Sequence, residues 1–335
     1  MPKAFSLLSL LILFSCSPPG DEASGSKWPR KAIEISCFAA QGGGTDQICR
    51  MVAQAMEADL GVKINVVNRE AGRGGAAINH VWSGKHDGHR WGGFSESVLP
   101  GSVLGITETT AKDWTFFMVA GAPGVLSVKA DSPVQSLQEL VARAEANPGG
   151  IKLAAGLTGG LWHTKMIALQ SAASIHFNFI PFQGSQPSQL AALSGEVDAV
   201  LTSVSEQAEL IKGGRLRPLA MIELEAFPFP GGATIPSAVE SYPGIASVPV
   251  SQFLGFALPA DTAPEILARI QTAFEKAMES DLIKKHAGNN LLSLLGKSGA
   301  EADSLAQAAE KAWTWKLQEL GIATRSPADL GIERP

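Results

Sequence analysis

The residues that could carry chemistry lie in three glycine-containing stretches. The first reads FAAQGGGTD at 38–46, between a short apolar run and an expected helix; the others read GLTGGLWHTK at 156–165 and FQGS at 182–185. Glycine lets an anion approach the backbone closely and tolerates positive φ. The first N–H groups of a helix are unpaired and carry about half a positive charge. These stretches predict loops that hold an anion through backbone amides, although the first could also be a tight turn without a ligand.

Side chains that could catalyse a reaction or hold a metal form no convincing motif. His86 and His89 have a spacing that invites a metal or a base, but HDGHRW at 86–91 is typical of a loop leading into a strand. There is no Gly-x-Ser-x-Gly sequence, no nucleophilic pairing of Cys with His, and no Gly-Lys-Ser/Thr ending after the triple glycine. We expect a binding protein with no catalytic residue, no metal and no cofactor.

Strand-like and helix-like patterns alternate along the chain and would position these loops. The segment 32–38 is rich in β-branched and aromatic residues, and from about Thr45 apolar residues recur at helical spacing until Gly61. This alternation indicates an α/β protein with parallel sheets covered by helices, in which ligands bind beyond the carboxyl ends of strands. Further strands are expected at 62–68, 90–94, 116–120, 125–128, 151–155, 177–181, 199–202, 216–221 and 253–258, and further helices at 136–146, 161–173, 188–194, 205–212, 264–280 and 300–320.

Length and composition describe an ordinary soluble globular chain that is long enough for two domains. Of its 335 residues 45% are hydrophobic and 18% charged, and 27 basic against 32 acidic residues give a formal charge of −5. No run of Lys and Arg stands out, so nucleic-acid binding is not expected. Because the chain is acidic, an anion needs a local source of positive potential, which helix N-termini provide.

The first 27 residues read as export signals rather than as part of the fold. Lys3 precedes an apolar run at 5–14 that is shorter than the roughly 20 residues of a membrane span. The tetrapeptide LFSC that ends at Cys16 resembles the lipobox of bacterial lipoproteins, and 17–27 has the composition of a flexible tether. We expect a signal peptide at 1–15, a lipidated Cys16, and a protein anchored in the periplasm or cell envelope of a bacterium. An ordinary signal peptide is the alternative.

Cys37 and Cys49 are the cysteines left once Cys16 is set aside. A disulfide is permitted in an exported protein, but Cys37 ends a strand and Cys49 lies on the first helix, so geometry must decide. Two buried free thiols are the favoured interpretation. No Cys-x-x-Cys pair or His/Cys cluster suggests a metal site.

Seven longer segments form a pattern through their order and spacing. They are WPRKAIEISCFAAQGGGTD, GVKINVVNREAGRGG, KHDGHRWGG, SLQELVARAEANPGGIKLA, IPFQGSQPSQLAALSGEVDAVLTSVSE, IKGGRLRPLA and FLGFALPADTAPEIL. Each is a weak signal alone, but together, from about Trp28 to Leu320, the chain resembles the solute receptors of tripartite tricarboxylate transporters, the Bug-type periplasmic binding proteins.

The resemblance implies a two-lobed, hinged periplasmic-binding-protein fold, each lobe a mostly parallel sheet flanked by helices. Residues 28–127 and 249–335 would form one lobe and 128–248 the other, with crossings near 124–128 and 248–253. The lobes would close around a small carboxylate-bearing solute, gripped by one strand-to-helix loop from each lobe. The implied partners are this solute and the membrane subunits of the transporter, and the receptor would be a monomer.

The resemblance and the loop chemistry together assign the ligand contacts. Phe38 would be an apolar wall of the first loop, while Asp46 could cap the helix or bond across the loop. His163 could be structural rather than ligand-binding, and Ser185 could cap a helix or touch the solute. The predicted ligand-binding residues are Phe38, Ala39, Ala40, Gln41, Gly42, Gly43, Gly44, Asp46, Ser95, Gly156, Thr158, Gly159, Gly160, Trp162, His163, Gln183, Gly184, Ser185 and Ser203.

The chain also departs from the family pattern. Cys37 stands where the family usually has proline, and Leu161 and Trp162 precede His163 where Ser or Thr is common. Ala155 and Gly156 replace serines of the second loop. The binding mode could therefore carry over while the ligand does not, and a Trp162 exposed to the ligand would favour a larger or flatter apolar body.

Two other functions are considered. One is a lipoprotein that binds the same kind of solute and then docks on a signalling receptor, which the sequence does not separate from a transport receptor. The other is a secreted enzyme acting on carboxylic acids, which the missing catalytic motifs argue against.

Overall fold

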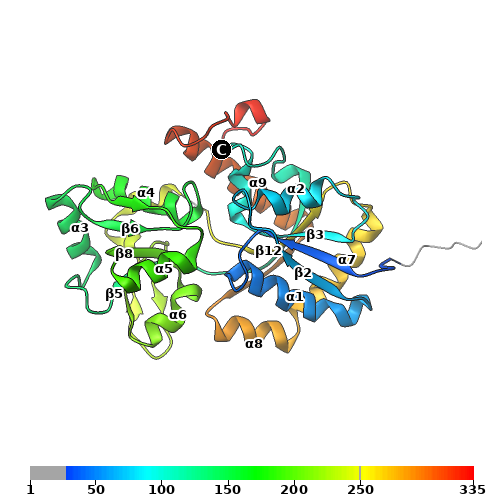
Figure 1. The fold of residues 1–335 in the computed structure, drawn as a ribbon, viewed down its shortest axis with the longest axis horizontal. Coiled ribbons are helices and arrows are strands. Elements are labelled where there is room, and N and C mark those ends of the chain that lie inside the picture. The colour runs from blue at the N-terminus through cyan, green and yellow to red at the C-terminus, as the bar shows by residue number, and fades with distance from the viewer. Residues whose placement is uncertain (1–27, 249) are drawn as a thin grey trace, which may run out of the picture.

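Apolar strands collect into two sheets, and amphipathic helices pack against each of them to form two lobes that lie side by side (Figure 1). The computed structural model describes residues 28–248 and 250–335. The predicted signal peptide, the lipidated Cys16 and the tether lie outside the described residues.

The first lobe has a sheet of six strands. They are β1 (Ile33–Cys37), β2 (Ile64–Asn68), β3 (Arg90–Ser95), β4 (Trp114–Gly121), β12 (Leu254–Pro259) and β13 (Ser293–Ser298), in the order β13-β4-β12-β3-β1-β2. Its helices are α1 (Gly44–Leu60), α2 (Gly75–Trp82), α7 (Pro264–Met278), α8 (Asp281–Asn289) and α9 (Gly299–Glu319), with short 3₁₀ turns η1 (Glu96–Gly101) and η2 (Ala111–Asp113). The side chains of β1, α1, β12 and α7 share one buried core.

The second lobe has a sheet of five strands. They are β5 (Gly124–Lys129), β6 (Lys152–Ala154), β7 (Asn178–Ile180), β8 (Ala199–Ser203) and β9 (Leu216–Met221), in the order β7-β6-β8-β5-β9. Its helices are α3 (Leu137–Ala146), α4 (Leu161–Ala173), α5 (Ser185–Ser194) and α6 (Val204–Lys212). A separate two-stranded ladder joins β10 (Phe227–Pro228) to β11 (Thr234–Ile235).

The predicted α/β fold with two lobes is confirmed, with sheets that are more mixed than expected. In the first sheet β1 pairs in parallel with β2 and β3, but β12 and β13 run antiparallel to β4. In the second sheet β6 is parallel to β7 and β8, whereas β5 is antiparallel to β8 and β9. Both β5 and β12, which follow the two crossings, run in the opposite direction to their neighbouring strands, and β13 at the edge of the first sheet does so too.

The helix α1 follows the sequence pattern closely, while five short α-helices and strands of the described residues were not predicted. Gly61 ends α1 in the left-handed conformation, with φ 72°, where glycine carries no steric penalty. The elements that were not predicted are the helices 75–82 and 281–289 and the strands 227–228, 234–235 and 293–298. The expected helix at 264–280 is found as α7, which ends at Met278, and Ser280 caps the next helix, α8, by accepting from the Ile283 amide at 3.3 Å.

The chain crosses between lobes slightly earlier than expected, and α9 contacts both lobes. Since β4 ends at Gly121 and β5 begins at Gly124, the first crossing is at 122–123 rather than 124–128. The first half of α9 packs on the first lobe through Ala302 and Ala306. Its second half brings Trp313 into the core of the second lobe, where the indole N–H donates to Thr164 Oγ1 at 3.0 Å.

Within 28–248 and 250–335, no helix has the length and apolar character needed to cross a membrane.

Candidate functional site

The N-terminal ends of four helices meet where the two lobes face each other. α1 comes from the first lobe, and α4, α5 and α6 come from the second. A Cβ built on Gly44 would lie 3.6 Å from Glu206 Oε1 of α6, and one on Gly159 would lie 3.3 Å from Leu104 Cδ1 of the first lobe. The Arg73 guanidinium, in the loop between β2 and α2, donates to the carbonyl oxygen of Thr158. These contacts place the predicted loops of both lobes against one another (Figure 1).

The first loop is held by Asp46, whose side chain is 2% exposed. Asp46 Oδ2 accepts from the Gly42 amide at 2.9 Å and from Arg50 Nε at 3.1 Å, and Oδ1 accepts from Asn68 Nδ2 at 2.8 Å. Burial alone would raise the pKa of Asp46, but these hydrogen bonds outweigh it and lower the pKa. Of the two roles predicted for Asp46, the geometry shows the bond across the loop, so this carboxylate positions the loop.

The amides at the start of α1 are open. Gly43, the N-cap, has no side chain to cap the helix, and its own amide donates to Ala40 O at 3.1 Å. Among the described residues, the amides of Gly44, Thr45 and Asp46 donate to no acceptor. Three parallel N–H groups at a helix N-terminus form a site that favours an anion.

The second loop repeats this arrangement at the start of α4. Gly160 is its N-cap, again without a side-chain cap, and its amide donates to Leu157 O at 3.0 Å. Within the part of the chain that the structure describes, the amides of Leu161, Trp162 and His163 have no acceptor. The first lobe therefore presents α1 and the second lobe presents α4, each a glycine-capped helix with three amides that have no acceptor; α5 of the second lobe also follows a glycine N-cap, Gly184, without a side-chain cap.

His163 has the geometry of a structural residue. Its Nδ1 accepts from the Gly159 amide at 2.9 Å, its ring stacks on Phe179 with centroids 4.0 Å apart, and it is 7% exposed. Burial lowers the pKa of His163 to about 4, and the charge of Arg73 adds to this effect. The imidazole is therefore neutral at pH 7, and it fixes the loop rather than offering a cation to a ligand.

Trp162 is buried, with 6% of the residue exposed. A Cβ on Gly124 would lie 2.6 Å from Trp162 Cζ3, so the indole fills the space beside the first crossing. The Gly124 amide donates to Glu223 Oε1 at 2.9 Å, and the same oxygen lies 2.6 Å from the buried Lys165 Nζ. The side chain of Trp162 thus belongs to the packing of the second lobe, while its backbone amide remains open.

Several other groups that were predicted to bind the ligand form hydrogen bonds within the protein instead. The Gly156 amide donates to Ser188 Oγ at 3.2 Å, and Gly184, with φ 111°, donates to Phe182 O at 2.8 Å. Ser203 caps α6 and Ser95 caps η1 through their hydroxyl oxygens. Ser185 is the first residue of α5 and not its cap.

The remaining predicted residues lie on the surface of the loops. Phe38 packs against Gly74, where a Cβ would lie 2.7 Å from Phe38 Cδ2. Its ring therefore lines the β2–α2 loop, next to the residue that reaches Thr158. Those still exposed or partly exposed are Ala39, Ala40, Gln41, Thr158 and Gln183.

Three charged residues at this site were missed from the sequence: Arg73, Glu96 and Glu206. Glu206 faces Gly44 with Oε1, and its Oε2 accepts from the Ser203 hydroxyl at 2.6 Å. Glu96 is 2% exposed, and Oε2 accepts from the Phe253 amide at 3.1 Å. Burial raises the pKa of Glu206, and it raises the pKa of Glu96 to about 8, with the charge of Glu206 adding to the latter effect. Arg73 lies in a segment singled out for its family resemblance, but nothing in its spacing points to Thr158.

The histidines considered for a metal have other partners. His86 Nδ1 contacts Asp261 Oδ1 at 2.5 Å and its Nε2 contacts Trp82 O at 2.9 Å, whereas His89 Nδ1 contacts Asp87 O at 3.1 Å. Across the described residues no three His, Cys, Asp or Glu side chains are grouped so as to hold a metal ion.

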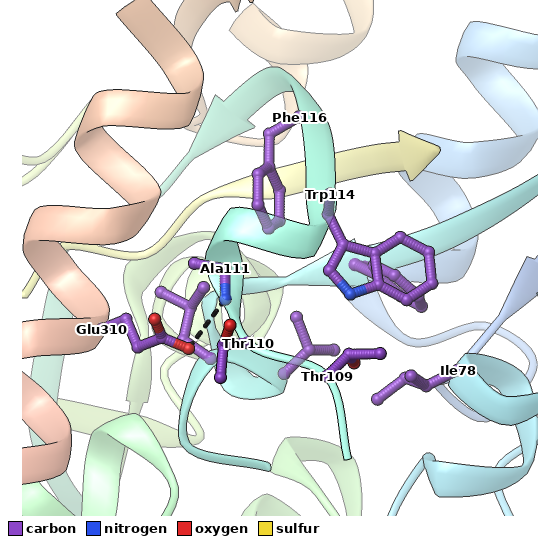
Figure 2. Close-up of a pocket in the computed structure, with 10 residues that line it drawn as sticks. Ile78, Thr109, Thr110, Ala111, Trp114, Phe116 and Glu310 are labelled. Carbon is purple, nitrogen blue, oxygen red and sulfur yellow. Dashed lines mark hydrogen bonds between the residues drawn. The ribbon is translucent and has the colours of Figure 1, made fainter. Parts of the chain in front are cut away.

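A small cavity in the first lobe lies away from these loops. It is about 10 Å³ in volume and is lined by residues of α2, β3, β4, η1 and η2 and by Glu310 of α9. Figure 2 shows Glu310 Oε1 accepting from the Ala111 amide, at 2.8 Å, beside Trp114 and Phe116. A volume of this size fits about one water molecule, so it is no site for an organic solute.

A family model described as "Tripartite tricarboxylate transporter family receptor" matches residues 48–322. The chain belongs to this receptor family. The matched range includes the second and third loops and begins just after the first. Membership in a receptor family confirms the prediction of a solute receptor rather than an enzyme.

Relatives and solved structures agree with this assignment. The receptor is 30% identical over 268 residues to the "UPF0065 protein in gbd 5'region" of Cupriavidus necator, covering 77% of this chain and 78% of that protein. It resembles the structure of R. palustris Rpa4515 with adipate at a TM-score of 0.77 and 21% identity, covering 88% of this chain and 99% of the other. It resembles MatC (Rpa3494) from Rhodopseudomonas palustris with bound malate at a TM-score of 0.75 and 20% identity, covering 87% and 100%. At these identities the structures show the fold alone.

Proposed function

We propose that this receptor captures a small carboxylate-bearing solute between its lobes and delivers it to the membrane subunits of a tripartite tricarboxylate-type transporter. The observation that carries the proposal is the pair of glycine-capped helices, α1 and α4, whose open amides come from opposite lobes. A carboxylate end that accepts from both sets of amides stabilises the closed arrangement, because it has contacts there that neither lobe supplies alone.

The solved structures of similar fold support a carboxylate as the ligand class. Rpa4515 has adipate and MatC has malate. In this receptor Arg73 adds one cation beside Thr158, so the proposed site combines backbone amides with a single guanidinium. Charge-assisted hydrogen bonds of this kind contribute about 1.5–3 kcal/mol each.

Glu206 limits which carboxylates fit. Its Oε1 lies beside Gly44, so a second negative group on the ligand at this point meets a carboxyl group instead of an amide. A ligand with a hydroxyl or amino hydrogen at this point donates to Glu206 and gains a hydrogen bond. We therefore expect the receptor to prefer hydroxy or amino acids to unsubstituted dicarboxylates of the same length.

The same proposal includes the placement of the receptor. The segment 1–15 would direct export, Cys16 would carry the lipid anchor, and binding would take place on the outer side of the cytoplasmic membrane. The receptor would act as a monomer, since one chain supplies both lobes.

A thermal-shift and calorimetry panel tests the function. Purified receptor is mixed with malate, citrate, adipate and aspartate, and with the neutral dimethyl ester of malic acid as the matched control. A binding acid raises Tm by about 2–8 °C, as about 1–2 kcal/mol of linkage does in a protein of this size, and the ester leaves Tm unchanged. Equal shifts with the acid and the ester, or a shift with simple amines alone, would overturn the proposal.

A further inference from the structure

The thiols of Cys37 and Cys49 lie next to each other beneath the first loop. Both side chains are fully buried and free. Cys37 is the last residue of β1 and is paired with Gly93 of β3, while Cys49 lies in the second turn of α1. The point where a Cβ of Gly93 would stand is 2.5 Å from Cys49 Sγ and 3.2 Å from the Cα of Cys37. The space left by the missing side chain of Gly93 is thus taken up by the sulfur of Cys49 and borders the backbone of Cys37.

We propose that Cys37 and Cys49 are joined by a disulfide in the exported receptor, and that this bond closes a ring around the first loop. The two thiols hydrogen-bond to each other, so the sulfurs are already neighbours. Residues 38–48 lie inside the ring, and they include the open amides of Gly44, Thr45 and Asp46. A covalent ring at this place keeps these amides in position before the ligand arrives.

The two thiols are also unequal in acidity. The hydrogen bond with Cys49 lowers the pKa of the Cys37 thiol, whereas the same hydrogen bond and burial raise the pKa of the Cys49 thiol. The more acidic thiol of a pair forms the thiolate, which is the nucleophile in disulfide exchange. The other contact of Cys49 is a long one, 3.7 Å from Sγ to Gly255 O, so little is lost when this sulfur becomes bonded.

The oxidant for this step is a small-molecule or protein disulfide of the oxidising compartment, which is itself reduced to two thiols. One cysteine thiolate attacks a sulfur of the oxidant, which releases one reduced thiol and leaves a mixed disulfide. The second cysteine then attacks the first, releases the second reduced thiol, and the oxidant has taken two electrons while the cysteines have lost two protons. Because both sulfurs are buried, the exchange takes place while the chain folds.

The test is a peptide mass measurement on the full receptor exported by a bacterial host. Denatured protein is treated with iodoacetamide without reduction and then cut with trypsin, which releases residues 32–50 as one peptide that holds both cysteines and excludes Cys16. We expect this peptide without label and lighter by two hydrogens, and with two labels after dithiothreitol. Two labels without reduction, even after the chain is refolded with oxidised glutathione, or a glutathione adduct in place of the ring, would overturn the proposal.

A second measurement uses stability. Dithiothreitol should lower the Tm of the wild-type receptor by about 5–10 °C, as expected for a ring of this length, and should leave the Cys37→Ser/Cys49→Ala double variant unchanged. An equal response of both proteins would contradict the ring. Neither measurement needs a ligand, so the disulfide can fail or hold independently of the proposed function. If the double variant does not fold, the peptide mass of the wild type decides alone.

Discussion

The N-termini of α1 and α4 are built in one way, and the N-terminus of α6 is built in the opposite way, although all three point toward the same place. Gly43 and Gly160 stand at the N-caps with extended backbone, φ −68° and −71°, and no side chain caps the helix. At α6, Ser203 accepts from the Glu206 amide at 3.3 Å, while Glu206 Oε2 accepts from the Ser203 amide at 3.2 Å. This is a complete capping box.

The difference shows how a helix end becomes available to a ligand. In helices such as α3 and α8, the caps Ser136 and Ser280 each satisfy one of the first amides through the side-chain oxygen. With glycine in the cap position the helix loses only a few tenths of a kcal/mol, yet its first amides stay open. We infer that the glycines of α1 and α4 keep these ends open for binding, and that the box on α6 keeps the third end closed.

The largest effect on ligand affinity is expected from blocking the open amides at the N-terminus of α1. Gly43→Asp places a capping carboxylate on α1 at a position whose backbone already suits an N-cap, and this carboxylate takes up the amides and repels an anion. Binding should weaken by about 100–1,000-fold, as the loss of about 3–4 kcal/mol predicts, with stability unchanged or slightly higher. Calorimetry with the best acid of the panel and urea unfolding measure both quantities.

The matched control for this substitution is Gly288→Asp on the exposed side of α8, where a new Cβ meets nothing within 4 Å. It adds the same charge to the same lobe and should leave affinity unchanged. Should Gly43→Asp bind as tightly as this control, the open end of α1 has no part in binding and the contrast with α6 loses its functional meaning.

The next effect concerns the protonation of Glu96, a buried residue of η1 that is close enough to Glu206 at the start of α6 to feel its charge. Burial raises the pKa of Glu96 from 4.5 to about 8, with a further contribution from Glu206. The folded state thus keeps a proton that the unfolded chain releases between pH 4.5 and 8. The free energy of unfolding should therefore fall as pH rises through this window, by about 2–4 kcal/mol. Glu96→Gln should remove most of this fall in urea unfolding at pH 5.5 and pH 8.5.

Glu310 is the comparison for that measurement. Burial raises the pKa of Glu310 to about 7, so this residue also makes the free energy of unfolding fall as pH rises. It lies in the first lobe, away from Glu96 and Glu206. Glu310→Gln should reduce the slope by a smaller amount. If the Glu96→Gln variant keeps the full dependence of the unfolding free energy on pH, Glu96 is ionised at neutral pH in the wild type. The N-terminus of α6 then differs from those of α1 and α4 in charge as well as in hydrogen bonding.

The third-largest effect is expected from replacing Arg73. Asn tolerates the left-handed backbone of this residue, φ 58°, so Arg73→Asn removes the cation without straining the loop. Affinity should fall by about 10–30-fold, equivalent to about 1.5–2 kcal/mol, and should become less sensitive to salt. Titrations at low and high ionic strength measure this, with the exposed Arg215→Asn as the control for lost charge. Unchanged affinity would leave the amides as the whole of the anion site.

The sequence pattern predicts helices, strands and loops well because these depend on residues that are close together in the chain. The end of α1 at Gly61 and the glycine loops before α1 and α4 follow from local chemistry. The second lobe was harder to delimit, since β5 begins immediately after the two-residue crossing at 122–123 and nothing in Gly124 separates a strand start from a hinge.

The roles of side chains depend on what tertiary folding brings near them. Asp46 and His163 look like ligand contacts in sequence, but Gly42 and Gly159 use their polar atoms. Trp162 stands two residues after Gly160, yet its indole packs against Gly124, far away in the chain. Contacts of this kind have no signal in the spacing of residues.

The smallest effect comes from opening the closed end. Ser203→Ala removes the oxygen that accepts from the Glu206 amide and should cost about 1 kcal/mol of stability. Ser136→Ala on α3 is the matched control, because Ser136 accepts from the Glu139 amide in the same way at 3.2 Å. Ser203→Ala should lose more stability than Ser136→Ala, because it also removes the hydrogen bond from the Ser203 hydroxyl to Glu206 Oε2. Both variants should keep the wild-type affinity, since Glu206 still stands beside Gly44 and repels an anion after its cap is gone. A severalfold gain in affinity for Ser203→Ala alone would mean that the hydroxyl, rather than the Glu206 carboxyl, keeps the ligand from the third helix.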